Sequence, residues 1–161
     1  MMTKRVSVLV GGALALMLAG AASAAGTPAV NDGYDWTMRV NEDRTSDAIL
    51  AYEVDNTDDQ PLNFTCEEGS GRVFAGISGG APDLAAIELE SGGQRVRLTG
   101  TTDADELPTF SAQEMPATSP LFRAFAANGW LRMTADGAAV DMAATANGKQ
   151  EIQRFARFCA G

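Results

Sequence analysis

The sequence predicts an α+β domain: mainly an antiparallel β-sheet or sandwich of about eight strands, with two packed helices and one disulfide. Three observations lead to this prediction. Short stretches alternate hydrophobic and polar residues, tight turns join several of them, and two later stretches repeat hydrophobic residues at helical spacing. The 161 residues contain no internal repeat, so we expect a single domain after an N-terminal leader.

The leader is predicted at residues 1–24. Lys4 and Arg5 precede a short apolar core, and Ala22–Ala24 form a small-residue cleavage site. An uncleaved membrane anchor is the less favoured alternative because the apolar run is short. We therefore expect residues 25–161 to be a single secreted β-rich domain, periplasmic or released, without stable membrane insertion.

Two strands are expected first, in DWTMRVNED and ILAYEVDN. Their alternation places one hydrophobic set on a single face of the sheet. The inward residues would be Trp36, Met38, Val40, Leu50, Tyr52 and Val54.

A hairpin is expected in NFTCEEGSGRV. Folding this stretch about a two-residue turn at Gly69-Ser70 sets Cys66 opposite Val73 on the inner face. The same register sets Glu67 opposite Arg72 on the outer face, which predicts a cross-strand ion pair rather than a catalytic acid.

Two further hairpins follow, about Gly92-Gly93 and Asp136-Gly137. In each, hydrophobic residues pair inside and opposite charges pair outside. The expected charged pairs are Glu90 with Arg95, Glu88 with Arg97, and Arg132 with Asp141.

Between these hairpins, TTDADELPTFSAQEMPATSP is irregular, with a possible short strand near Phe110. A helix is then predicted, with Ser119 as N-cap, Pro120 in the first turn and Gly129 as its end. A final helix runs to the C-terminus, and Asn147 is its expected cap.

Cys66 and Cys159 are the two cysteines of the chain. An even count in an exported protein favours a disulfide. Strand alternation turns Cys66 inward, and helical spacing from Ile152 through Phe155 turns Cys159 inward. The alternative, two free thiols in redox or metal chemistry, lacks a CxxC motif and a nearby cation in phase.

Composition excludes several functions. The chain has no histidine, which excludes Ser-His-Asp and Cys-His catalysis and histidine-ligated metal. Its net charge is −9, and removing Lys4 and Arg5 makes it −11. Such a surface disfavours nucleic acid and suits a protein partner, basic in character. No calcium-loop spacing is present, so we expect no metal and no cofactor, and weak calcium binding by the acidic loops is the less favoured alternative.

Four acids in the irregular segment lack an obvious hairpin partner: Asp103, Asp105, Glu106 and Glu114. They form a candidate binding loop, because irregular segments on a regular sheet often carry function. The alternatives are a solvated acidic surface or a carboxylate-based hydrolase, which would need two of them facing one cleft. We assign no catalytic residue.

The order of motifs resembles the TagO/VasI type of periplasmic domain associated with type VI secretion. The resemblance spans Trp36–Cys159 and rests on DWTM, LNFTC, a helix before WLRM, and GKQEIQRFARFC. It implies a non-enzymatic accessory role in the bacterial cell envelope, associated with a secretion system. It carries over no catalytic residues.

The expected function is therefore an exported, non-enzymatic binding or accessory module. The alternative is a periplasmic inhibitor of a basic hydrolase such as lysozyme, for which a small acidic β domain is electrostatically suited.

The leader gives the first testable prediction. N-terminal sequencing of the exported protein should begin at or near Ala25, because the small-residue site precedes it. A membrane-bound product that retains Met1 would contradict the prediction.

Overall fold

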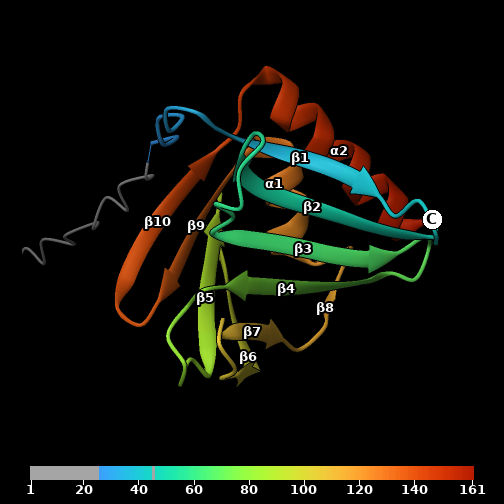
Figure 1. Ribbon diagram of the computed structural model, residues 1–161. Coiled ribbons are helices and arrows are strands. Elements are labelled where there is room, and N and C mark those ends of the chain that lie inside the picture. The colour runs from blue at the N-terminus through green and yellow to red at the C-terminus, as the bar shows by residue number, and fades with distance from the viewer. Residues whose placement is uncertain (1–25, 45) are drawn as a thin grey trace, which may run out of the picture.

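The computed structural model describes residues 26–44 and 46–161, so the leader predicted at residues 1–24 lies outside the described residues. Figure 1 shows one strongly curved sheet with both helices against it. Its strand order is β1-β2-β3-β4-β7-β6-β5-β9-β10, with β8 paired to β4, and every pairing is antiparallel.

The strands are β1 Tyr34–Val40, β2 Asp47–Val54, β3 Leu62–Glu67, β4 Arg72–Ser78, β5 Ala86–Ser91, β6 Gln94–Asp103, β7 Thr109–Ala112, β8 Met115–Pro116, β9 Trp130–Ala135 and β10 Ala138–Ala143. The helices are α1 Pro120–Asn128 and α2 Ala146–Ala160.

The α+β class, the antiparallel sheet and the two helices are confirmed, but the architecture is one nearly closed, barrel-like sheet rather than a sandwich. The strand count is ten because β7 and β8 form in the segment predicted to be mostly irregular. The long strand β6 pairs first with β5 and then with β7, which carries the sheet around its bend. At this bend a Cβ on Gly100 would meet the carbonyl oxygen of Ser111 at 2.2 Å.

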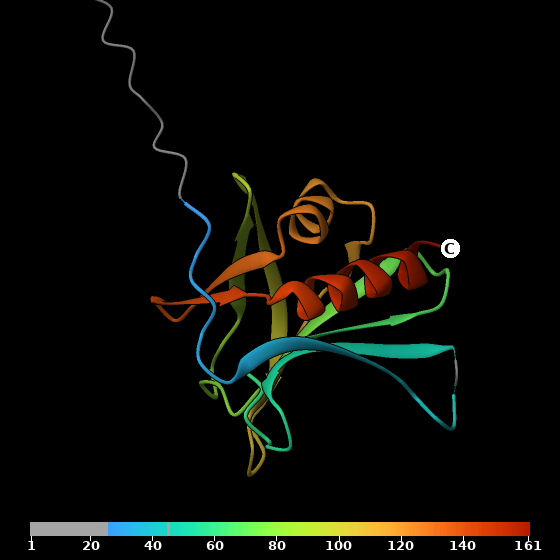
Figure 2. The same ribbon diagram turned by 90° about the horizontal axis from the view of Figure 1, so that it is seen from above.

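The helices cover the inner face of the sheet, and Figure 2 shows both on the same side of β1 to β3. An aromatic cluster fills the space between them. Its members are Trp36, Tyr52, Phe64, Phe122, Phe125 and Phe155. The Trp36 indole donates to the carbonyl of Met142 at 3.2 Å, which links edge strand β1 to edge strand β10. Within the described ranges, no helix is long and apolar enough to span a bilayer.

The hairpins about Gly92-Gly93 and Asp136-Gly137 have the predicted registers. Their outer faces carry the predicted ion pairs. The nitrogen–oxygen distances are 2.7 Å for Arg95–Glu90, 3.8 Å for Arg97–Glu88 and 2.6 Å for Arg132–Asp141.

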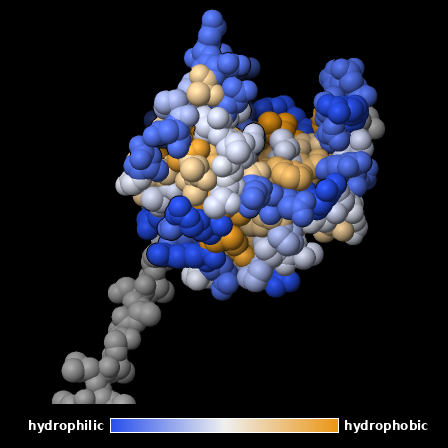
Figure 3. All heavy atoms as spheres, turned by 90° about the horizontal axis from the view of Figure 1, so that it is seen from below, coloured by the Kyte–Doolittle hydropathy of each residue, from blue (hydrophilic) through white to orange (hydrophobic). Residues whose placement is uncertain are grey.

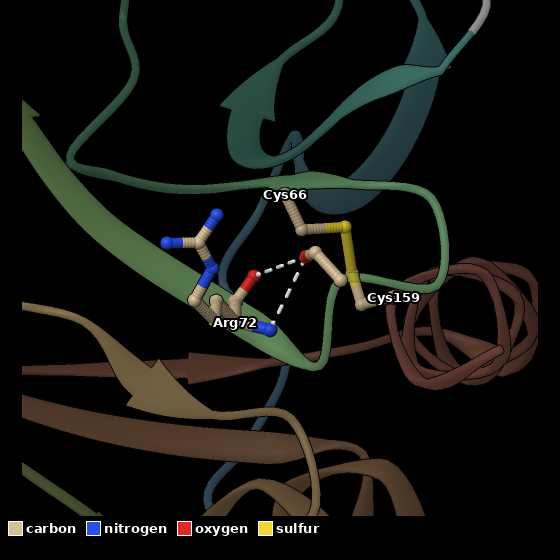
Figure 4. Close-up of a disulfide and its surroundings, with 4 residues drawn as sticks. Cys66, Arg72 and Cys159 are labelled. Atoms are coloured by element: carbon tan, nitrogen blue, oxygen red, sulfur yellow. Dashed lines mark hydrogen bonds between the residues drawn. A yellow bond between two sulfur atoms is a disulfide. The ribbon is translucent and has the colours of Figure 1, made fainter.

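The first hairpin also has the predicted register, with Phe64 opposite Ala75. However, the two-residue turn is wrong, because four residues separate β3 from β4. The predicted Glu67–Arg72 pair is wrong as well, since Arg72 pairs with Glu114 at 3.7 Å when β8 lies beside β4. The Ser70 hydroxyl accepts the Arg72 amide at 3.2 Å (Figure 4).

Helix α1 begins as predicted. The Ser119 hydroxyl accepts the amide of Phe122 at 3.2 Å, and Gly129 ends the helix in the left-handed region at φ 74°. Glycine adopts this conformation without the steric cost of a Cβ.

Helix α2 begins differently from the prediction, since its N-cap is Thr145 and not Asn147. The Thr145 hydroxyl accepts the Asn147 and Gly148 amides, each at 3.2 Å. Asp35 of β1 reinforces this end: its carboxylate accepts the amides of Thr145 at 3.0 Å and Gly148 at 3.1 Å. A carboxylate here also complements the positive end of the helix dipole.

The other end of α2 is held by the predicted disulfide. Cys66 and Cys159 are bonded, with their Cα atoms 5.8 Å apart, and both are buried (Figure 4). The turn between β3 and β4 completes the attachment, because the amides of Gly69 and Gly71 donate to the carbonyls of Phe158 and Cys159, each at 2.9 Å. These bonds explain the longer turn, since both glycines need positive φ to reach the helix.

Replacing Cys159 with Ser should lower the free energy of unfolding by about 2–5 kcal/mol, the range for a native bridge in a small secreted domain. Urea denaturation of this variant and of the wild type, each with and without reductant, measures the loss. Reduction should destabilise the wild type alone. Two titratable thiols per chain in the unreduced, unfolded wild type would contradict the bridge.

Replacing Gly148 with Ala tests the attachment of the first turn of α2 to Asp35. An alanine normally favours a helix interior by about 1 kcal/mol. Here its Cβ would meet Asp35 Oδ1 at 1.9 Å, so we expect a net loss of about 1–3 kcal/mol. In an Asp35→Ala background the same change should be neutral or stabilising. Equal destabilisation in both backgrounds would show that Asp35 is not the cause.

Candidate functional site

The acidic residues chosen from the sequence fall in two separate places. Asp103 ends β6, opposite Thr109, and Asp105 and Glu106 lie in the exposed turn that follows. Glu114 lies beyond the other end of β7 and pairs with Arg72. The structure thus brings together three of the four acids, at the tip of the β6–β7 hairpin.

This acidic tip is a surface feature. In the ranges 26–44 and 46–161, no group of three or more acidic or cysteine side chains is arranged to hold a metal ion. The tip also carries Leu107, whose exposed fraction of 62% is high for a large hydrophobic residue.

A hollow of a different kind lies on the outer face of the sheet, opposite the helices. We call it the outer groove. It has a volume of about 500 Å³ and crosses β1, β2, β3 and β4, and a second hollow of about 320 Å³ continues it toward β7. The two hollows share Thr65 and Phe74.

The floor of the outer groove follows directly from strand register. Arg39 lies opposite Ile49, Ile49 opposite Thr65, and Thr65 opposite Phe74. One straight row of side chains therefore crosses four strands. Alternation fixes this row on the outer face, because the neighbouring residues along each strand point into the core.

Phe74 is the distinctive member of this row. Its exposed fraction is 38%, whereas hydrophobic residues on the inner side of β4 are buried. Figure 3 shows a hollow with hydrophobic side chains on its floor between two hydrophilic projections of the surface. An aromatic side chain exposed in a concave surface is a frequent feature of binding sites.

The next row along the strands is small and polar, with Ala51 opposite Asn63 and Asn63 opposite Gly76. A Cβ on Gly76 would meet the Asn63 side-chain oxygen at 2.9 Å. The small residues leave the second hollow open.

A polar network beside the groove fixes the position of Arg39. Glu53 is only 8% exposed and accepts a bidentate bond from Arg39, together with a bond from Gln60 at 3.1 Å. Gln60 in turn accepts from Asn63 at 3.1 Å. The Arg39 hydrogen bonds lower the pKa of Glu53, against the effect of its burial.

The opposite end of the outer groove is acidic. Asp47 and Glu67 lie directly across from each other on β2 and β3. Asp47 pairs with Arg44 at 3.3 Å, and that arginine side chain is largely exposed. Within the described part of the chain, Glu67 makes no ion pair.

Sequence reasoning missed the outer groove although a signal was present. In RVFAGI the alternation that turns Val73, Ala75 and Ile77 inward must turn Phe74 outward, and Ile49 is similarly out of phase on β2. Large hydrophobic residues on the solvent side of neighbouring strands are informative where they form a contiguous patch, since such patches mark interaction surfaces.

No protein-family model, curated protein or solved structure matches this chain.

Glu53 provides a pH-dependent prediction. Because its pKa is lowered in the folded protein, its ion pair stabilises the fold above the ordinary pKa of a glutamate, and this contribution disappears as the pH falls through the lowered value. Glu53→Gln should cost about 1–2 kcal/mol at pH 7, with a difference from wild type that shrinks toward pH 3. Denaturant unfolding across this range measures it, and a constant difference would contradict the assignment.

Proposed function

We propose that this chain is an exported, non-enzymatic binding module of the bacterial cell envelope that engages a protein partner through the outer groove. The observation that carries the proposal is the row from Arg39 to Phe74, in which Ile49 and Phe74 offer partly exposed apolar surface. Arg39 lies at one end of this row, and Asp47 and Glu67 lie in the neighbouring row. The row from Arg39 to Phe74 differs from the rest of the outer face, where opposite charges mostly face each other in hairpins.

Several features support a binding role over catalysis. The chain has no histidine, and the acids of the irregular segment are divided between a hairpin tip and an ion pair with Arg72. Glu53, the most enclosed carboxylate beside the groove, is bonded to Arg39 and Gln60. An acid held in this way stabilises a surface and is not positioned to exchange protons with a substrate.

Export is supported by the disulfide, which persists in oxidising compartments, and by the leader-like residues 1–24. The location we propose is periplasmic or secreted. The resemblance to TagO/VasI domains adds a more specific proposal, an accessory role beside a secretion system. The attached terminal helix and Gly148 at its start belong to the motifs on which that resemblance rests.

Site-specific photocrosslinking in the producing cell tests the proposal. A photoreactive amino acid at Phe74 should yield a defined adduct whose protein partner is identified by mass spectrometry. The same amino acid at Val30, which is 46% exposed outside the groove, is the matched control. Adducts that are equal at both positions, or absent at Phe74, would refute a partner in the groove.

The second candidate function is inhibition of a basic hydrolase such as lysozyme. The specific observation that favours it is the acidic tip with exposed Leu107, whose charge complements the surface of a basic hydrolase. The purified protein should then inhibit lysozyme, and Leu107→Ser should weaken inhibition more than Phe74→Ser does. Lack of inhibition at micromolar protein would exclude this activity.

A further inference from the structure

The charges at the acidic end of the outer groove are unbalanced. Asp47 and Glu67 face each other across β2 and β3, and like charges in such pairs destabilise a sheet. Arg72, the nearest cation on the hairpin partner strand, is turned to Glu114 instead. Among the residues that the structure describes, Arg44 is the one cation that pairs with either carboxylate, and it pairs with Asp47.

A second cation would relieve this repulsion. The protein as a whole favours one, because its net charge is −9. The neighbouring row offers Ile49 and Phe74 as an apolar surface for an adjacent side chain. The groove therefore presents two different contacts side by side, one apolar and one anionic.

The spacing of these contacts matches an extended peptide. Ile49 and Asp47 are two residues apart on β2, and Thr65 and Glu67 are two residues apart on β3. Two residues of a strand span about 7 Å. In an extended peptide, side chains at positions i and i+2 point to one side with the same separation.

We infer that the outer groove binds an extended segment of a protein partner that carries a large apolar residue and a lysine or arginine two positions apart. The apolar side chain packs on Ile49 and Phe74, and the cation lies between Asp47 and Glu67. This inference rests on the proposed binding function and specifies the chemistry of its partner.

The test uses acetylated, amidated eight-residue peptides of alanine and serine with one leucine and one lysine two positions apart. Two control peptides carry glutamate in place of lysine or serine in place of leucine. Titration into the isotope-labelled protein, followed by NMR, gives both the affinity and the amides that shift. The leucine–lysine peptide should bind saturably and shift Ile49, Thr65 and Phe74, and both control peptides should bind more weakly.

Charge reversal provides the sharper readout. Glu67→Lys should lower the affinity for the leucine–lysine peptide about tenfold and raise the affinity for the leucine–glutamate peptide. Asp83→Lys, at an exposed position outside both hollows, changes the net charge equally and should leave both affinities unchanged. Phe74→Ser should lower the affinity for both peptides. Thermal unfolding confirms that each variant is folded.

Four outcomes would overturn the inference. Equal effects of Glu67→Lys and Asp83→Lys would show attraction by net charge alone. Equal affinity for the lysine and glutamate peptides would remove the cation requirement. Self-association that Phe74→Ser abolishes would assign the groove to a second copy of the chain. If a partner crosslinks at Phe74 but no peptide binds, the chemistry proposed here fails and the binding function stands.

Discussion

The structure depends above all on the attachment of α2 to the sheet at both of its ends. Asp35 of β1 binds the first amides of the helix, and the Cys66–Cys159 disulfide joins its last turn to β3. The glycine amides of the β3–β4 turn bind the final carbonyls. The ends of a helix leave backbone amides and carbonyls without partners inside the helix. These contacts supply the missing hydrogen bonds and also fix the position of the helix on the sheet. The aromatic cluster beneath is enclosed as a result.

Because of this arrangement, only one face of the sheet is covered by the helices. The inner face holds the core, so substitutions there act on stability. The outer face of β1 to β4 is free of the helices, and its row of side chains is set by the same registers that close the core. The Glu53 network holds Arg39 at the edge of the row without blocking the hollow. A rigid sheet can thus present a preorganised contact surface, which reduces the entropic cost of binding.

Local rules were sufficient to predict most of the fold. Alternation and turn residues identified the three hairpin registers, and the even cysteine count together with strand and helix phase identified the disulfide. Errors arose where distant segments meet. Arg72 pairs with Glu114 and not with Glu67, because β8 lies beside β4. The first turn is longer than predicted because its glycine amides bind α2. Asp35 and Thr145 together displaced Asn147 as the cap. The outer groove was missed for a related reason, since it forms from four strands that are adjacent only in the folded sheet.

Amide hydrogen exchange at Gly69 and Gly71 tests the central claim most directly. Both residues lie in a surface turn, where amides usually exchange by small local openings. If the turn is bound to the end of α2 as described, the amide hydrogens of these two glycines should exchange with solvent as slowly as those of Ile152 and Phe155 in the core of the helix. Exchange as fast as at Gly93, at the open side of the β5–β6 turn, would contradict the attachment.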